Sequence, residues 1–318
     1  MRYLLFVVKL AVLGGLGFAL VVLAGVAGSS LHWSFDLAAQ FLLPAVVVAG
    51  AATLAAAACR WPRIAGGGLA TAVAAYLVAA PFTSAPSPVA KDAARFKVLL
   101  FNVWHANWRL DDVREMVRDT DADIVVFVEA TPRIIGELQP LGALYPYRFD
   151  CVGSGRCDIA VFARTRLSSP AVKATADPDR SPVVQIETQV AGCRMKLFAT
   201  HMTRPFPNRP YWAQRAQAEE IAGDVAGWPG AKLVLGDFNA APWGYVMRTI
   251  VERGNVRVLT GAGGTWHSRL PPQLRIPIDH MLAGPGLSFV SRRVLPRIGS
   301  DHLPVLAEIA VTDPGQCG

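Results

Sequence analysis

The stretch LVLGDFNAAPW, Leu233–Trp243, predicts how the second half of this chain folds. Its first residues are apolar or small, as in a buried strand, and the strand ends on Asp237 and Asn239 with Phe238 between them. Because side chains alternate between the two faces of a strand, residues two positions apart point the same way. Asp237 and Asn239 are therefore expected to face one point just beyond the carboxyl end of a buried strand.

Strands and helices alternate on both sides of this stretch, from residue 96 to the end of the chain. Many strands with few helices predict a layered α/β domain, in which two sheets pack face to face and helices cover the outside. The predicted strands cover about residues 96–104, 122–131, 158–164, 182–190, 194–202, 231–238, 277–284, 287–295 and 303–311, and the predicted helices cover 109–120 and 209–227.

Three long apolar runs precede this domain, at about residues 3–27, 37–58 and 64–82. Each is about as long as a helix that crosses a bilayer. A cleaved signal peptide is the alternative for the first run, but its apolar part is too long and two more runs follow. We predict three transmembrane helices within residues 1–82, a linker rich in Pro, Ala and Ser at 83–95, and a folded domain at 96–318.

The basic residues that flank these runs predict their orientation. Arg2 and Lys9 lie at the N-terminal side, the first loop has no Lys or Arg, and the second loop, CRWPR, has two. The positive-inside rule then places the N-terminus and the second loop in the cytoplasm. The expected protein is a multi-pass protein of the cell (inner) membrane, and its folded domain is extracytoplasmic.

The charge of the chain is weak evidence for nucleic acid as a partner. The formal net charge is +7, but residues 1–95 hold six Lys or Arg and only two Asp or Glu. The rest of the chain has 25 basic and 22 acidic side chains. Proteins that bind nucleic acid usually concentrate basic side chains on one face, and no such cluster is visible in this domain.

The five cysteines leave two interpretations open. Cys151 and Cys157 flank VGSGR, whose glycines would let the chain close a small disulfide loop, and an exported domain permits that bond. Five unpaired thiols are the alternative. The spacings do not resemble a zinc site.

Several buried strands end on polar side chains, as the opening stretch does. Each one alone is most simply a turn former, a helix cap or a packed histidine. Three of them are carboxylates beside strongly apolar runs, and if they converge their repulsion must be offset by a cation. Carboxylate and Asn oxygens favour Mg²⁺ or Mn²⁺. The strand-end residues are Asn102, Glu129, His201, Asp237, Asn239, Asp279, His280, Ser300, Asp301 and His302.

Asp279 and His302 supply a carboxylate and an imidazole from separate strands. Such a pair orients the ring and stabilises its protonated form, so His302 is expected to act as a general base for water.

This set of residues resembles the endonuclease/exonuclease/phosphatase superfamily, which includes deoxyribonuclease I, exonuclease III, neutral sphingomyelinases and inositol polyphosphate 5-phosphatases. The resemblance runs from about Phe96 to Val311 with the motifs in the family's order, and its most specific parts are GDFN at 236–239 and SDH at 300–302. It implies a four-layer α/β/β/α sandwich of the deoxyribonuclease I type, with the active site at one edge of the paired sheets.

The resemblance also implies roles for the strand-end residues. Glu129 would bind the divalent metal, helped by Asn102 and Asp301. Asp237 and Asn239 would hold the attacking water, the phosphate or a second metal.

The same resemblance makes His302 the base, oriented by Asp279, and gives His201 a contact with the phosphoryl oxygens or the leaving group. Many nucleases of the family carry Gln just before the metal-binding Glu, but Val128 stands there. With no obvious basic insertion to grip a duplex, this weakens the expectation of a nuclease.

Four further polar residues near the motifs receive no catalytic role. His105, His267 and His280 are expected behind the catalytic residues or at the rim of the site. Arg204 follows His201 closely and either contacts a phosphate or is a surface arginine, and the second interpretation is slightly favoured.

Three hypotheses follow. The first is a membrane-anchored, metal-dependent phosphoesterase that acts on extracytoplasmic phosphate esters, lipid-linked ones included, and it resembles membrane-anchored bacterial branches of the superfamily. The second, less favoured, is an anchored nuclease acting on external DNA or RNA. The third is a non-enzymatic protein with a retired hydrolase domain, which the intact set of charged residues argues against, because unneutralised buried charge is costly. The substrate, the number of metals, the preference for diesters or monoesters and the oligomeric state stay open.

Overall fold

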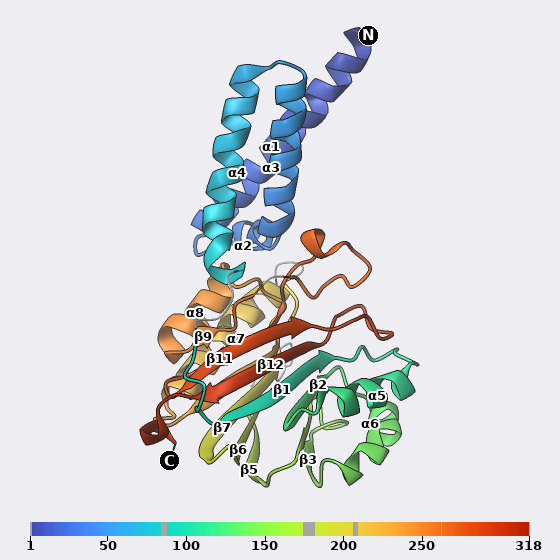
Figure 1. Ribbon diagram of the computed structural model, residues 1–318, viewed down its shortest axis with the longest axis vertical. Helices are drawn as coiled ribbons and strands as arrows, with labels where there is room; N and C mark the ends of the chain where they lie inside the picture. Colours follow the sequence, from blue (N-terminus) through green and yellow to red (C-terminus); the bar gives the residue numbers. More distant parts are fainter. Residues whose placement is uncertain (1, 84–87, 174–181, 206–208, 262, 318) are drawn as a thin grey trace.

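The computed structural model describes residues 2–83, 88–173, 182–205, 209–261 and 263–317. A group of N-terminal helices stands on one end of an α/β domain (Figure 1). These helices are α1 (Arg2–Gly28), α2 (Trp33–Ala39), α3 (Leu42–Ala58) and α4 (Pro62–Thr83).

Helices α1 and α4 are each long and apolar enough to cross a membrane. The second predicted run, 37–58, is not one continuous helix, because α2 and α3 meet at a bend of 63°. Together this bent pair would make a third span. Helix α3 alone has 17 residues, at the lower limit for a bilayer-spanning helix.

The break between α2 and α3 follows from contacts with the α/β domain. Asp36 accepts a hydrogen bond from the backbone N–H of Tyr245 at 2.9 Å, and the Gln40 side chain accepts one from Ala241 at 2.7 Å. The indole of Trp243 donates to the carbonyl of Ala39 at 2.5 Å. Helix α2 is therefore fastened to the segment that follows the GDFN motif, and it does not continue the axis of α3.

The α/β domain contains two six-stranded sheets. The first has the order β11-β12-β1-β2-β4-β3 and the second has the order β5-β6-β7-β8-β10-β9. The strands of the first sheet are β1 (Arg95–Asn102), β2 (Ile124–Val128), β3 (Tyr147–Asp150), β4 (Ala160–Ala163), β11 (Leu287–Val294) and β12 (Val305–Val311). Those of the second are β5 (Leu167–Lys173), β6 (Val183–Val190), β7 (Cys193–His201), β8 (Lys232–Asp237), β9 (Arg257–Val258) and β10 (Asp279–Ala283).

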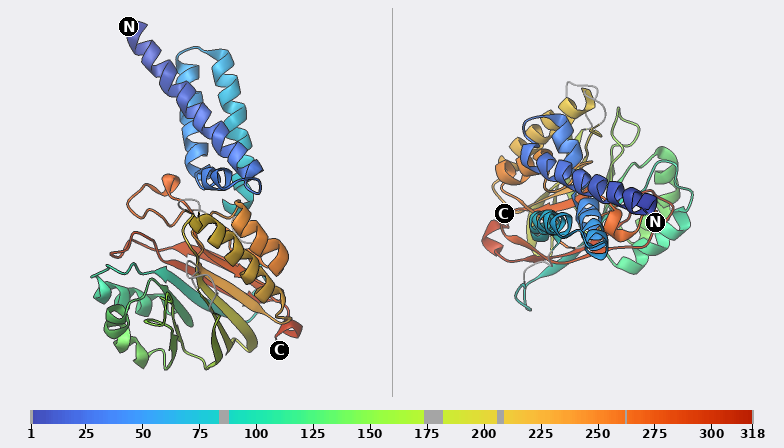
Figure 2. Two further views of the ribbon diagram at one scale, coloured as in Figure 1. Left: turned by 180° about the vertical axis from the view of Figure 1, so that it is seen from behind. Right: turned by 90° about the horizontal axis from the view of Figure 1, so that it is seen from above.

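Helices cover the outer face of each sheet (Figures 1 and 2). Helices α5 (Leu110–Thr120) and α6 (Pro132–Leu138) pack with β1, β2 and β4. Helices α7 (Arg209–Ala226) and α8 (Tyr245–Gly254) pack on β8 and β10 of the other sheet. The predicted four-layer α/β/β/α sandwich is confirmed. Short 3₁₀ turns lie at Gln139–Ala143, Pro272–Leu274 and Pro314–Gln316.

Alternation along the central strands decides which side chains face the space between the sheets. In β8, Leu233 and Leu235 lie in the core between the sheets, whereas Val234 packs under the outer helices. Asp237 has the same parity as Leu233 and Leu235, so it continues the inner face at the strand's end. The same rule places Asn102 at the inner end of β1, where Leu100 belongs to the central core.

Two disulfides close loops in the α/β domain. Cys151 and Cys157 form a disulfide across six positions. The alternative interpretation, in which all five thiols are unpaired, is therefore wrong for this pair. A second bond, which the sequence analysis did not predict, joins Cys193 at the start of β7 to Cys317 near the C-terminus. Cys59 in the N-terminal helices is free.

Removing the second disulfide is expected to cost more stability than removing the first. The Cys193–Cys317 bond spans 124 positions and the other spans six, and the entropy of the unfolded chain falls more when a longer loop is closed. The Cys193→Ala/Cys317→Ala variant should lose about 2.7 kcal/mol more unfolding free energy than Cys151→Ala/Cys157→Ala. Unfolding of the full-length proteins in detergent, followed by tryptophan fluorescence, measures both. Equal losses would contradict the loop-length argument.

Candidate active site

The strand ends of both sheets meet at the edge of the sandwich below the N-terminal helices. In the second sheet, Asp237 of β8 pairs in register with His201 of β7 on one side and with Asp279 of β10 on the other. Gly236 precedes Asp237 with a φ of 152°, and a Cβ atom there would overlap the carbonyl oxygen of Thr200. Glycine is therefore required at position 236, where β7 and β8 come close, directly before Asp237.

Asn102 joins the two sheets at this edge. Its side-chain nitrogen donates to Glu129 at 3.1 Å and to Asp237 at 3.0 Å, and all three residues are buried. Glu129 follows β2 with a φ of 58°, in the left-handed region. Its inner neighbour Val128 belongs to the central core, so strand alternation alone would turn Glu129 outward, and the left-handed residue brings its carboxylate to the inner edge.

Three buried side chains are arranged as ligands of a cation. One ligand atom from each of Glu129, Asp237 and His302 lies within 4.8 Å of the other two. Among the described residues, Asp301 lies outside this group, and the Trp266 indole donates to one of its oxygens at 3.2 Å. Its other oxygen is buried, and so is one oxygen of Asp279, and neither has a hydrogen-bond partner among the residues that the structure describes. Carboxylates with unsatisfied buried oxygens fit a hard divalent ion such as Mg²⁺ or Mn²⁺.

The charge state of Asp237 also fits a cation. Burial raises the pKa of Asp237 to about 6, and the negative charge of Asp279 adds to this, while His302 and His201 oppose it. A carboxylate this deeply buried is stabilised in its charged form by a positive partner.

His302 and Asp279 form the predicted pair. The ring nitrogen Nδ1 lies 2.9 Å from Asp279 Oδ2, and both side chains are buried. The other nitrogen, Nε2, lies 3.7 Å from Asp237 Oδ2 and faces the cluster of Glu129 and Asn102. Burial lowers the pKa of His302, but the charges of Asp279 and Asp237 outweigh it and raise the pKa to about 10.

Ser300 holds this histidine in place. Its hydroxyl donates to the carbonyl of Asn102 at 2.8 Å and accepts the backbone N–H of His302 at 3.0 Å. The serine of the SDH motif thus ties the start of the last strand to the end of β1.

His201 has a carboxylate partner that the sequence analysis missed. Its Nδ1 lies 2.8 Å from Asp158, and its Nε2 lies 3.9 Å from Asp237. Burial opposes the charged ring, but the hydrogen bond and charge of Asp158 raise the pKa of His201 to about 9. Asp158 comes directly before a buried apolar run, so the rule used for the other strand ends would have found it.

Two residues interpreted as peripheral contact the carboxylate of Glu129. His105 Nδ1 lies 3.0 Å from Oε2, and a guanidinium nitrogen of Arg204 lies 3.3 Å from Oε1. Burial raises the pKa of Glu129, but the hydrogen bond from His105, the charge of His201 and the amide of Asn102 lower it to about 2. The Arg204 side chain is 66% exposed, so a positive group faces solvent at the mouth of the site.

The remaining candidates lie around this centre. The backbone N–H of Asn239 donates to Asp237 at 2.8 Å, and its side-chain amide donates to the carbonyl of Met202 at 2.9 Å, so it shapes the loop. His280 bonds the carbonyl of Ala240, and burial lowers its pKa to about 4, so it is a neutral core residue. The ring of His267 accepts the backbone N–H of Arg269, away from the carboxylates.

A hollow of about 240 Å³ opens beside the carboxylates, and we call it the active-site hollow. One wall belongs to the site itself and the other belongs to the N-terminal helices and apolar side chains. Its lining residues are Leu37, Gln40, Phe41, Arg204, Pro205, Asn239, Trp266, Ile276, Ile278, Asp301 and His302.

Comparison with known proteins identifies the family of the α/β domain. Residues 99–302 match the Endonuclease/Exonuclease/phosphatase family. A 227-residue segment is 21% identical to the RNA-directed DNA polymerase from mobile element jockey of Drosophila melanogaster, and it covers 68% of this chain. The chain spans about a quarter of that relative, 24% of its length.

Solved structures share the fold at low identity. An endonuclease/exonuclease/phosphatase from Bacteroides vulgatus has a TM-score of 0.58 and 17% identity, over 68% of this chain and 99% of that one. Humanized D. rerio TDP2 has a TM-score of 0.57 and 12% identity, with the same coverage. Sphingomyelinase C from Streptomyces griseocarneus has a TM-score of 0.52 and 16% identity, over 67% and 99%. The match over residues 99–302, with the four-layer fold and the strand-end carboxylates and histidines, shows that this chain belongs to the endonuclease/exonuclease/phosphatase family.

Proposed function

We propose that this chain is a membrane-anchored, metal-dependent phosphoesterase that hydrolyses extracytoplasmic phosphate esters, and lipid-linked phosphates in particular. The active-site hollow carries this proposal. Asp301 and His302 line it together with Leu37 of helix α2 and Phe41, which lies at the bend between α2 and α3. A substrate with a phosphate and a long apolar chain would place its phosphate at the polar residues of the site and its apolar chain against Leu37 and Phe41.

In this proposal Glu129 and Asp237 hold the divalent cation, with Asn102 bridging them and Asp301 supplying a further carboxylate at the wall of the hollow. The bound ion would polarise a phosphoryl oxygen and offset the charge that develops during hydrolysis.

His302 is the proposed general base. Asp279 accepts the hydrogen bond from Nδ1, so Nε2 is the atom that would take a proton from water. The ring must first be neutral, and a cation bound beside Asp237 would lower the pKa of His302 by offsetting the carboxylate charges that raise it. The charge of Asp279 then stabilises the imidazolium. His201, held by Asp158, and the exposed Arg204 are the positive groups that would contact the other phosphoryl oxygens, and Asn239 keeps the loop beside Asp237 in shape.

Two features support a location outside the cytoplasm. Disulfides persist in oxidising compartments, and the α/β domain has two of them. Arg60 in the connection between α3 and α4 and Arg63 in the first turn of α4 lie at the end of the helices that is far from this domain (Figure 1). By the positive-inside rule that end is cytoplasmic, so the α/β domain lies on the opposite side.

The substrate class can be tested with a variant of the hollow. Phe41→Ala in the full-length protein should lower kcat/KM for a long-chain isoprenyl phosphate by about tenfold, because burying a Phe side chain contributes about 1.5–3 kcal/mol. The loss for bis-p-nitrophenyl phosphate, which has no apolar chain, should be smaller. Phe18→Ala is the matched control, since Phe18 on α1 has the same 38% exposure and does not line the hollow.

Equal losses of Phe41→Ala on both substrates would contradict a lipid-binding hollow. Faster turnover of plasmid DNA than of any lipid-linked phosphate would favour the alternative of an anchored nuclease.

A further inference from the structure

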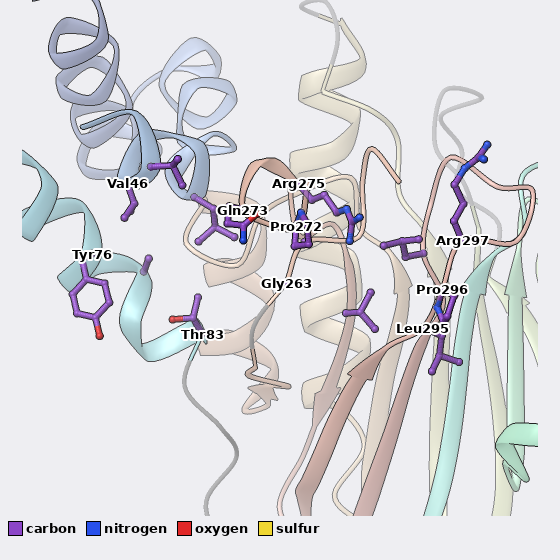
Figure 3. A pocket seen from close by; sticks show the side chains of 16 residues that line it. Val46, Tyr76, Thr83, Gly263, Pro272, Gln273, Arg275, Leu295, Pro296 and Arg297 are labelled. Atoms are coloured by element: carbon purple, nitrogen blue, oxygen red, sulfur yellow. The ribbon is translucent and has the colours of Figure 1, made fainter. Parts of the chain in front are cut away.

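A second and larger cavity lies where the N-terminal helices meet the α/β domain, and we call it the boundary cavity. Its volume is about 690 Å³. Figure 3 shows Val46 and Tyr76, from helices α3 and α4, on one side, and Arg275 and Arg297, from the α/β domain, on the other. We propose that the boundary cavity binds an anionic phospholipid, with its acyl chains along α3 and α4 and its phosphate at the two arginines. This inference rests on the membrane insertion proposed above, but not on the phosphoesterase activity.

The boundary cavity is separate from the active-site hollow. Among the described residues the two share no lining residue, and neighbours in the chain face different spaces. Arg275 lines the boundary cavity, whereas its neighbour Ile276 lines the active-site hollow. In the same way, Leu303 lines the boundary cavity and His302 lines the hollow. The wall is held by backbone hydrogen bonds, including one from Leu303 to the carbonyl of Thr265 at 3.1 Å.

The helix side of the boundary cavity fits acyl chains. Leu43, Val46 and Val47 come from the first part of α3, and Tyr76 and Ala79 come from the last part of α4. Val47 and Tyr76 are 40% and 58% exposed, so an apolar groove is open to the surroundings of the helices. If α3 and α4 cross a bilayer, this end of them lies at the level of the headgroups, where tyrosine is enriched.

The domain side fits a phosphate. The Nε atom of Arg275 donates to the carbonyl of Leu270 at 2.7 Å, and that of Arg297 donates to the Ser268 hydroxyl at 3.0 Å. These bonds orient each guanidinium and engage only one of its five N–H groups. No acidic side chain is among the described residues that line the cavity, so the terminal nitrogens face no competing carboxylate there. Arginine binds phosphate through such paired N–H groups.

The experiment measures binding of a fluorescent phosphatidylglycerol to the full-length protein in nanodiscs of phosphatidylcholine. A basic residue near an anionic membrane surface strengthens attraction by about fivefold. The Arg275→Gln/Arg297→Gln variant should therefore bind at least tenfold more weakly than the unchanged chain. Arg269→Gln/Arg293→Gln removes the same charge from two exposed arginines outside the cavity and should stay within twofold.

Further measurements distinguish specific binding of the phospholipid from a general effect of charge. Arg275→Lys/Arg297→Lys keeps the charge and should retain most of the affinity, and thermal unfolding verifies that each variant is folded. Competition by inorganic phosphate at millimolar concentration, or equal binding of labelled phosphatidylcholine, would overturn the proposal, as would unchanged affinity in the double Gln variant. Binding is repeated in Glu129→Gln protein, where it should persist, so a failure of the proposed hydrolase activity leaves this test intact.

Discussion

Replacing His302 with alanine is expected to lower turnover by a factor of about 10² to 10⁴, the usual contribution of a positioned general base. The ring is 3% exposed and its two nitrogens face Asp279 and Asp237, so its removal takes the proton acceptor from the centre of the site. Asp279→Asn should lose a large part of the same activity, because it removes the charge that stabilises the imidazolium. The two losses should not add, since the residues act as one unit.

Steady-state kinetics of the two single variants and the double variant, with bis-p-nitrophenyl phosphate, measure this coupling. The fold should survive in both single variants, and metal binding should persist in His302→Ala if the ring acts as the base. Fully additive defects, or normal turnover of His302→Ala, would show that another group is the base. Loss of metal binding in His302→Ala would instead make the ring a ligand, as its distance to Glu129 and Asp237 also allows.

Removing the divalent ion is expected to abolish activity. Glu129 and Asp237 are buried carboxylates in one cluster, and a metal ion usually contributes several kcal/mol to the stabilisation of a phosphoryl transition state, which is a factor of about 10³ or more in rate. Exhaustive EDTA treatment should therefore stop turnover, and Mg²⁺ or Mn²⁺ should restore it. Glu129→Gln should weaken the restoration, so that much more metal is needed for the same rate.

Glu137→Gln is the matched control for this experiment. Glu137 lies on α6 with its side chain 58% exposed, so the same substitution there should leave the metal dependence unchanged. Full turnover after chelation would contradict the metal-dependent mechanism.

The central strands could be predicted from the sequence because both of their faces are buried. The apolar side chains of β1 and β8 are buried on both faces of the sheet, so apolar residues follow one another directly along the middle of each strand. The strands β3, β5 and β9 were not predicted. β9 has two residues, β3 lies at a sheet edge, and all but the first residue of β5 are exposed, so no hydrophobic pattern marks them.

Part of the convergence of the site could be predicted, because parity along a strand is a local property that places Asn102 and Asp237 on the inner face. Asn102, Asp237 and His302 lie together at this edge, but the hydrogen bond to Asp301 comes from the Trp266 indole, 35 positions away in the sequence. The break between α2 and α3 likewise depends on hydrogen bonds to residues about 200 positions away. Such contacts leave no periodic trace in the chain.

The attachment of α2 to Ala241 and Trp243 has a consequence for how the enzyme meets its substrate. Both contacts lie within four residues of Asn239. The N-terminal helices and the loop that follows β8 are therefore held together directly, and the α/β domain is not joined to the helices by a flexible linker alone. If the helices insert into a bilayer as proposed, the reacting centre is held at a constant height above it, and a lipid-linked substrate of the proposed class would reach it by lateral diffusion in two dimensions. A chain cut at residue 95 would leave the Ala241 N–H and the Trp243 indole without these partners, so the isolated domain would lack the support of its own loop.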